Sequence, residues 1–133
     1  MFRALNYALA LALWCASAAS AAPHKPELPD IKPVQKTYKT IGDVELKMHI
    51  FNPPGWKAGD KRPAIVFFFG GGWRGGTPTQ FFPHCQYLAS RGMVAMAADY
   101  RVKGRQGVDP DKCVMDAKSA VRWIRQHAGD LGV

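Results

Sequence analysis

The sequence predicts an α/β domain in which an antiparallel hairpin precedes parallel β-α-β units. Two short runs of alternating apolar and polar residues come first, over 34–41 and 44–51. Two runs that are apolar throughout follow, and each is followed by a helical pattern. Strands that alternate with helices are typical of a parallel sheet with right-handed crossover connections.

The first residues resemble a targeting segment rather than part of a domain. The chain has 133 residues, which suffices for one domain. A basic start ending at Arg3 precedes an apolar run over 4–16 and a small-x-small site at 19–21. These features predict a signal peptide over 1–21, with an uncleaved N-terminal anchor as the alternative. A signal peptide implies a secreted or periplasmic protein without stable membrane insertion after its removal.

Charge and cysteine content narrow the function classes. The formal net charge is +8, but no run of five basic residues occurs, so we expect no nucleic-acid partner. Beyond the predicted signal peptide lie two cysteines, Cys85 and Cys113. An oxidising compartment allows one disulfide between them, with two buried free thiols as an equal alternative. Together with His84 they lack the ligand spacing of a zinc site, so we expect no metal and no cofactor.

An extended lead-in and a hairpin follow the predicted signal peptide. Residues 22–35 are rich in proline, which predicts an extended, solvated segment. The alternating runs on either side of Gly42-Asp43 predict two antiparallel strands joined by a tight turn, because both residues tolerate turn geometry.

Residues 64–69 and 93–98 predict two parallel strands. Both runs are apolar throughout, which is typical of strands that are buried on both faces of a sheet. Between them, residues 80–91 have helical spacing, and Gly92 provides a stop.

A second helix is predicted from Asp109 to about residue 128. Asp109 suits the N-cap and Pro110 the first helical position. We expect His127 to cap the other end at the surface and Gly129 to end the helix. Four apolar residues at helical spacing predict its buried stripe: Val114, Ala117, Val121 and Ile124.

The glycine-rich stretch FFFGGGWRGG over 67–76 has two interpretations. Its letters satisfy G-x-G-x-x-G, and Asp99 ends the next strand, as in a dinucleotide-binding domain. In that fold the helix begins within the motif, whereas here Pro78 delays it to about Thr79. The preceding hairpin also disfavours that fold, because its β-α-β unit normally opens the domain. An exported protein is in addition an unlikely place for a diffusible nicotinamide cofactor.

The favoured interpretation is an oxyanion hole. A tetrahedral intermediate of ester hydrolysis carries a negatively charged oxygen that needs several donors aimed at it. Backbone N–H groups of glycines supply such donors without crowding the acyl group. Trp73 then offers an apolar anchor and Arg74 a polar rim.

Three segments together resemble the α/β-hydrolase fold: FFFGGGW, the DYR after the next strand, and DAKSAVRWIRQHAGDLGV in the second helix. More narrowly, the chain is similar to esterase- and lipase-type hydrolases with an H-G-G-G-W loop. These include hormone-sensitive-lipase-like proteins and secreted feruloyl- and acetylxylan-esterase-like proteins. The resemblance covers about residues 36–133 and implies strands one to four of that domain with its first two helices, so that the domain is incomplete.

The resemblance assigns roles within the loop. Gly71 and Gly72 match the family's oxyanion N–H donors, and Gly70 supports the turn. Phe69 stands where the family usually has a histidine that mostly orders the loop. Phe69 is therefore the residue at which this chain departs from the family, and the departure bears on loop geometry and on substrate preference.

The segment Asp99-Tyr100-Arg101 matches the family's structural turn after the fourth strand, which organises the site without reacting. From the residues alone, Asp99 and Arg101 are equally well explained as an ion pair at a solvent-exposed edge. We expect this turn, with Trp73, to support the site.

The reacting residues are expected beyond this chain. The nucleophile elbow G-x-S-x-G does not occur in the sequence, and residues 88–92 are a near miss. Ser90 in that stretch lies between a predicted helix and a strand, whereas an elbow lies between a strand and a helix. The resemblance implies serine, acid and histidine after Val133, so we expect His84 only to pack near the loop or at its rim.

The resemblance therefore implies a serine-type carboxylic ester hydrolase, esterase- or lipase-like, that acts on a small-molecule or polysaccharide-linked ester. We expect the chain alone to be inactive. A non-catalytic binding module with the same fold start is the alternative. In the resembled fold a fifth strand pairs beside 64–69, so we also expect this strand to be an open edge.

Overall fold

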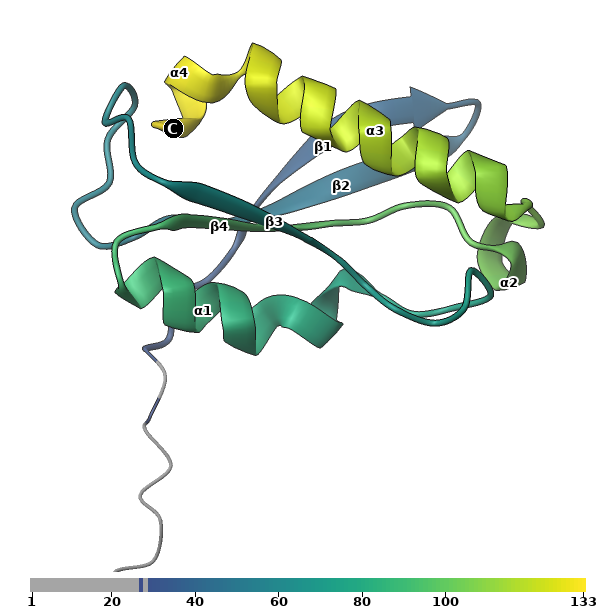
Figure 1. Ribbon diagram of the computed structural model, residues 1–133, viewed down its shortest axis with the longest axis horizontal. Helices are drawn as coiled ribbons and strands as arrows, with labels where there is room; N and C mark the ends of the chain where they lie inside the picture. The colour runs from purple at the N-terminus through teal and green to yellow at the C-terminus, as the bar shows by residue number, and fades with distance from the viewer. Residues whose placement is uncertain (1–26, 28) are drawn as a thin grey trace, which may run out of the picture.

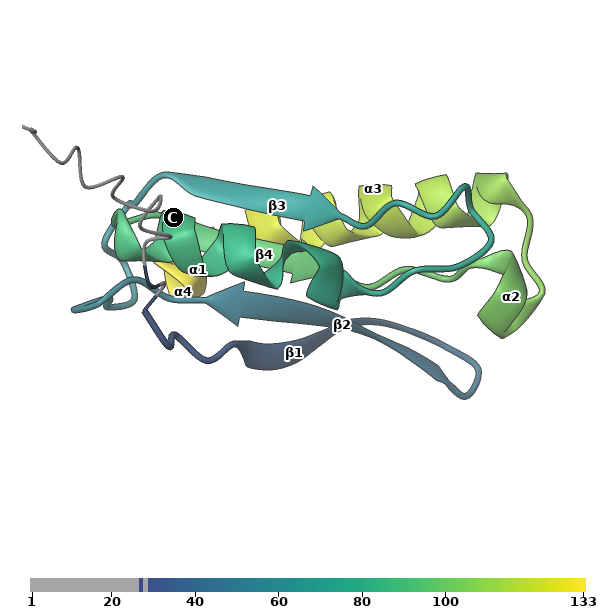
Figure 2. The same cartoon turned by 90° about the horizontal axis from the view of Figure 1, so that it is seen from below.

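The computed structural model describes residue 27 and residues 29–133. The predicted signal peptide and part of the lead-in lie outside these residues. One sheet contains β1 (Val34–Ile41), β2 (Val44–Phe51), β3 (Ala64–Phe68) and β4 (Val94–Ala98). Its strand order is β1-β2-β4-β3, with β3 at one edge (Figure 2).

The strand pairing follows the predicted topology. β1 and β2 form the predicted antiparallel hairpin around Gly42, whose φ of +55° favours glycine. β3 and β4 run parallel, with Ala64 beside Val94 and Phe68 beside Ala98. Because β2 and β4 are antiparallel, the sheet is mixed.

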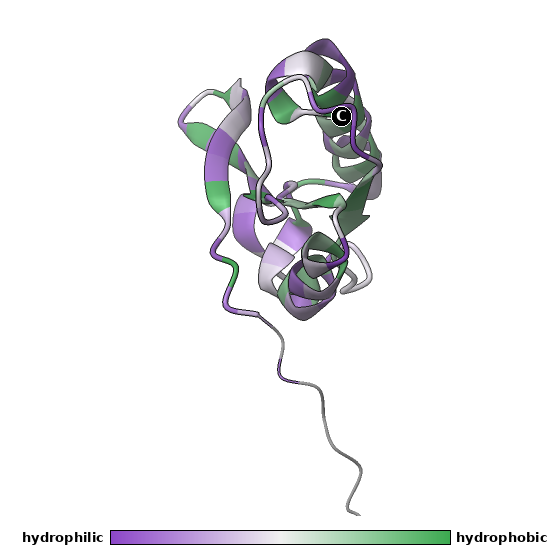
Figure 3. Cartoon of the chain, turned by 90° about the vertical axis from the view of Figure 1, so that its left-hand side faces the viewer, coloured by the Kyte–Doolittle hydropathy of each residue, from purple (hydrophilic) through white to green (hydrophobic). Residues whose placement is uncertain are grey.

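Helices cover both faces of the sheet. On one face the 3₁₀-helix η1 (Pro78–Phe81) continues into α1 (Phe82–Ser90), and on the other lie α3 (Pro110–Gln126) and α4 (Ala128–Leu131). Figure 1 and the end view in Figure 3 show α1 and α3 on opposite sides. The short α2 (Lys103–Gln106) lies beyond the end of β4. No helix among the described residues has the length and apolar character needed to cross a membrane.

The start of α3 agrees with the prediction, but its end does not. Asp109 is the N-cap residue and Pro110 the first helical residue, although the Asp109 side chain makes no capping hydrogen bond. His127 is the C-cap residue, and its ring Nδ1 lies 2.8 Å from a carbonyl oxygen one turn back. Gly129 lies inside α4 and ends neither helix, because Gly132, with φ of +68°, takes the left-handed position.

The face of α3 that packs on the sheet differs from the predicted stripe. Cys113, Asp116 and Ala120 are the buried residues of this helix, whereas Val114 is 40% exposed. Ile124 packs against the core, as predicted. The prediction was wrong for most of the stripe because α3 turns a carboxylate inward, where an apolar residue was expected.

β3 and β4 are similarly apolar but unequally buried. All of β4 is buried, as predicted. β3 is not buried on both faces, because Ala64 is exposed and residues 65–68 are half-buried. Among the described residues β3 pairs with β4 alone, so its other edge is open there, as the resemblance implied.

The two cysteines lie in separate parts of the core. Cys85 on α1 packs with Phe51, and Cys113 on α3 packs with Tyr100 and Val102. Both thiols are free, so the disulfide that the sequence allowed does not form. The reason is that the two helices lie on opposite faces of the sheet. Burial raises the pKa of Cys85 to about 12, so this thiol stays protonated and unreactive.

Candidate active site

The glycine loop, residues 70–76, leaves the carboxyl end of β3 and lies beside α2 (Figures 1 and 2). Ligands of open α/β sheets bind outside the carboxyl ends of the strands. The φ angles are +145° at Gly71, +59° at Gly72 and +104° at Gly76. Trp73 also has a positive φ, +66°, which is uncommon for a bulky residue. The loop therefore has a backbone conformation that residues other than glycine rarely adopt.

Two of the glycines are required by close contacts within the loop. A Cβ on Gly71 would lie 2.2 Å from the carbonyl oxygen of Gly75. A Cβ on Gly76 would lie 2.4 Å from the carbonyl oxygen of Gly70 and 2.6 Å from the ring of Phe69. The loop folds back on itself so tightly that a side chain at either position would displace backbone.

α2 holds the outer part of the loop. The N–H of Lys103 donates to the Trp73 carbonyl at 2.9 Å, and the N–H of Gly104 donates to the Arg74 carbonyl at 2.8 Å. The first N–H groups of a helix have no partner within it, so the loop carbonyls satisfy them. A Cβ on Gly104 would lie 2.6 Å from the Arg74 carbonyl oxygen, so this approach also needs glycine.

The N–H groups of the loop fall into two classes. The N–H of Gly70 donates to the side-chain oxygen of Gln80 at 2.7 Å. Within the described residues, the N–H groups of Gly71 and Gly72 donate no hydrogen bond. The two predicted oxyanion donors are thus free to bind an anion, and Gly70 is not. Their role as oxyanion donors stays a prediction.

Phe69 and Tyr100 support the loop from the protein interior. Phe69 is 2% exposed, and its ring stacks on that of Tyr100 with centroids 4.1 Å apart. The Tyr100 hydroxyl donates to the Phe69 carbonyl. Burial raises the pKa of Tyr100, so the hydroxyl keeps the proton that it donates. The residue at which the chain departs from the resembled family is therefore part of the support of the loop.

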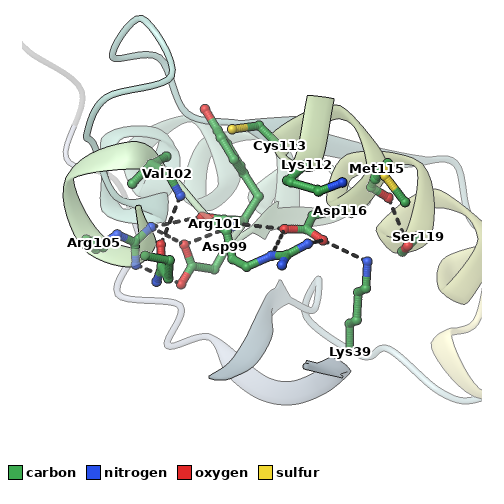
Figure 4. Close-up of polar contacts among 12 residues, drawn as sticks. Lys39, Asp99, Arg101, Val102, Arg105, Lys112, Cys113, Met115, Asp116 and Ser119 are labelled. Carbon is green, nitrogen blue, oxygen red and sulfur yellow. Dashed lines mark hydrogen bonds and ion pairs between the residues drawn. The ribbon is translucent and has the colours of Figure 1, made fainter. Parts of the chain in front are cut away.

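The predicted ion pair between Asp99 and Arg101 does not form. Arg101 binds Asp116 instead, with its Nε 2.8 Å from Oδ2. Asp99 binds Arg105, with 2.7 Å between Nη2 and Oδ1. Figure 4 shows the two pairs side by side at the end of β4. The turn is thus held by two separate ion pairs whose partners come from α2 and α3.

The sequence analysis missed Asp116, which is fully buried. Lys39 on β1 also binds its carboxylate, at 2.7 Å. Burial disfavours the charged carboxylate, but hydrogen bonds from Arg101 and Lys39 outweigh it and hold the pKa of Asp116 below its usual value. These bonds join α3 to β1 and to the turn after β4. Its spacing, three residues after Cys113 and four before Ala120, puts it on the same helix face as those two residues, but the spacing alone does not show that this face is the buried one.

An apolar groove of about 570 Å³ opens beside the loop. Its lining includes Phe69, Tyr100 and residues of α3. Trp73, predicted as an apolar anchor, also lines it and is 46% exposed. The rest of the predicted stripe of α3 faces this groove: Val114, Ala117 and Val121.

Two other residues singled out by the sequence play no part in the loop. The His84 ring packs 5.4 Å from that of Phe81, as the packing prediction requires. The Ser90 hydroxyl donates to the Tyr87 carbonyl at the end of α1, so Ser90 lies in no nucleophile elbow. The described residues contain no group of three or more histidine, cysteine or acidic residues that could hold a metal.

The geometry argues against the dinucleotide alternative. The first helical segment after the motif begins only at Pro78 and is a four-residue 3₁₀-helix. No helix N-terminus therefore lies within the motif to meet a pyrophosphate. Asp99 is engaged by Arg105 and is not free to bind a ribose.

Known proteins match this region of the chain. A family model described as BD-FAE matches residues 48–133. Native esterase 2 (Est2) of the planctomycete Thermogutta terrifontis is 58% identical, with a TM-score of 0.75, over 81% of this chain and 38% of that chain. The same esterase phosphorylated by paraoxon is 56% identical, with a TM-score of 0.75, over 84% of this chain and 42% of that chain.

The chain therefore spans about two fifths of the length of these esterases. The matched range begins within β2 and includes the glycine loop, the turn after β4 and α3. Because the family model matches more than half of the residues, this chain belongs to the BD-FAE family and has an open, mixed sheet of the α/β-hydrolase type.

Proposed function

We propose that this chain supplies the oxyanion-binding part of a serine-type carboxylic ester hydrolase. The observation that carries the proposal is the glycine loop, in which Gly71 and Gly72 keep unbonded N–H groups at the carboxyl end of β3. The identity to Thermogutta terrifontis esterase 2 supports it, because that protein is an esterase.

The proposed reaction is acyl transfer through a serine located after Val133. The serine attacks the ester carbonyl, a histidine takes its proton, and an acidic residue orients the histidine. As the tetrahedral intermediate forms, its oxygen becomes negative and accepts hydrogen bonds from Gly71 and Gly72. The histidine then protonates the leaving alcohol, and water releases the acid from the acyl-enzyme. Phosphorylation of the Thermogutta esterase by paraoxon is the behaviour of an enzyme with an activated nucleophile.

The proposed substrate is a small-molecule or polysaccharide-linked ester. Structures of the Thermogutta esterase with propionate and with butyrate support a short acyl group. The signal-like start over 1–21 supports a secreted or periplasmic location.

The test begins with the reading frame beyond Val133. We expect a G-x-S-x-G within roughly 25 residues, and hydrolysis of p-nitrophenyl acetate by the complete gene product. Gly71→Val should lower kcat by roughly 10²–10³, because the loop that carries an oxyanion donor cannot accommodate the side chain. The matched control is Gly42→Val in the hairpin turn, where no atom lies near the added Cβ.

The 133-residue chain alone is expected to show no hydrolysis above background. Turnover by this chain that disappears in Gly71→Val would contradict a nucleophile beyond Val133. A complete gene product without G-x-S-x-G and without turnover would favour the non-catalytic binding module.

A further inference from the structure

One peptide group of the loop is held at both of its polar atoms. The carbonyl of Phe69 accepts a hydrogen bond from the Tyr100 hydroxyl, and the N–H of Gly70 donates to Gln80 Oε1 at 2.7 Å. These two atoms belong to the same peptide bond. The side chains that bind them come from different elements, since Tyr100 follows β4 and Gln80 lies in η1.

This double contact matters because a peptide group is planar. Its carbonyl and N–H point in opposite directions, so a rotation of the plane moves both atoms together. Either contact alone opposes rotation, and the two together fix the plane from both sides. Glycines adopt many backbone conformations, so the residues that follow need a fixed starting point. The next two N–H groups along the chain are those of Gly71 and Gly72.

The two contacts differ in their surroundings. Tyr100 is 4% exposed and is stacked on Phe69, so its hydroxyl has little freedom to leave the Phe69 carbonyl. Gln80 is exposed, and its hydrogen bond to Gly70 competes with water. Gln80 is therefore the side that can be altered without disturbing the core.

We propose that Gln80 and Tyr100 are positioning residues that clamp the Phe69–Gly70 peptide and thereby direct the N–H groups of Gly71 and Gly72. The proposal rests on the proposed function, in which those N–H groups bind the oxyanion. It also explains how the loop keeps its shape with Phe69 in place of the histidine of the resembled family. The loop is ordered through backbone atoms of residue 69, whereas its side chain supports Tyr100.

The first measurement is amide hydrogen exchange of the 133-residue chain, which needs no activity. In Gln80→Met the Gly70 amide should exchange about ten-fold faster, because methionine is similar in length but has no carbonyl oxygen to accept the bond. Gln80→Glu keeps a side-chain oxygen and should retain most of the protection. Gln86→Met on α1 is the matched control and should leave Gly70 unchanged.

The second measurement is steady-state hydrolysis by the complete gene product. Gln80→Met should lower kcat by about ten-fold and leave KM within about two-fold, because misdirected donors affect the transition state more than the bound ester. Gln80→Glu should restore most of kcat. Tyr100→Phe should also lower kcat, and the double variant should lose less than the product of the single losses, because either change frees the same peptide.

The outcomes separate the clamp from the enzyme activity. If Gly70 exchanges at the same rate in wild type and Gln80→Met, the clamp proposal is wrong. An active gene product in which Gln80→Met keeps the wild-type kcat also overturns it. If the exchange rates differ as expected but the gene product hydrolyses no ester, the clamp stands and the proposed function fails.

Discussion

Two regions of this molecule, which we call the closed side and the open side, are both rich in apolar residues but are buried to different degrees. The closed side consists of β4 and the inner face of α3, formed by Cys113, Asp116 and Ala120, and it is buried throughout. The open side consists of β3 and the groove-facing residues of α3, and it is half-buried to exposed. The apolar composition of β3 and β4 is similar, so composition alone does not predict how deeply a strand is buried. The position of the strand in the sheet, at the edge or between two others, makes the difference.

The largest expected effect is on the closed side, at Asp116. Asp116→Ala leaves the partly buried Arg101 and Lys39 without their carboxylate, so it should lower the free energy of unfolding by about 3–5 kcal/mol. The control is Asp111→Ala on the same helix, whose pair with Lys112 is exposed to solvent and should therefore contribute far less to stability. Urea unfolding compares the two variants, and similar losses would contradict the role assigned to Asp116.

The pH dependence of this effect has a definite sign. The pKa of Asp116 is lower in the folded than in the unfolded chain, so its contribution is present above the ordinary pKa of an aspartate, about 3.9. The contribution is lost as the pH falls through the folded-state pKa below that value. In Asp116→Ala this part of the acid transition should be absent.

The second prediction compares the same substitution, valine to alanine, in β4 and in β3. Val94→Ala in β4 should cost about 2–3 kcal/mol, because it empties fully buried space. Val66→Ala in β3 should cost less than about 1.5 kcal/mol, because that side chain is half-buried at the edge. Chemical denaturation gives both values. Equal costs would mean that β3 is as well covered as β4.

A smaller effect is expected at His49 on β2. Burial lowers the pKa of His49, opposed by the charge of Asp99, and its Nδ1 has no hydrogen-bond partner within the described residues. Its contribution to stability is therefore complete above a pH of about 6.5 and is lost as the pH falls through the lower folded-state pKa. Thermal melting between pH 8 and 5 should show this loss, and His49→Gln should reduce it.

The smallest effect on unfolding is expected at the open edge. Ala64→Lys places a charge on an exposed strand position and should change the free energy of unfolding by less than about 0.5 kcal/mol. We expect the 133-residue wild type to self-associate through β3 and Ala64→Lys to reduce this in light scattering. A monodisperse wild-type monomer would show that the open edge of β3 does not mediate self-association.

The strands were predictable because their signals are local. Period-two alternation and uninterrupted apolar runs placed all four strands to within one residue of the observed ends. The inward turn of Asp116 was not predictable in this way, because its partners Lys39 and Arg101 are 77 and 15 residues away. α2 was missed as well, since four residues are too few to show a helical period.

The candidate site was predictable in part for the same reason. Glycine spacing identified the loop, and the structure leaves the expected N–H groups of Gly71 and Gly72 unbonded within the described residues. The bond from Gly70 to Gln80 depends on how the loop and η1 meet in space. No pattern of neighbouring residues encodes that contact, so the sequence alone does not predict the clamp.

The bonds from α2 to the loop carbonyls have a consequence for protein engineering. The loop and the segment 99–107 share the hydrogen bonds of Lys103 and Gly104, and Asp99 and Arg105 hold the segment in turn. If residues 69–76 alone were grafted into another scaffold, the carbonyls of Trp73 and Arg74 would lose the N–H groups that bind them here. The smallest unit that can be transplanted comprises both stretches, although 22 residues separate them in the chain.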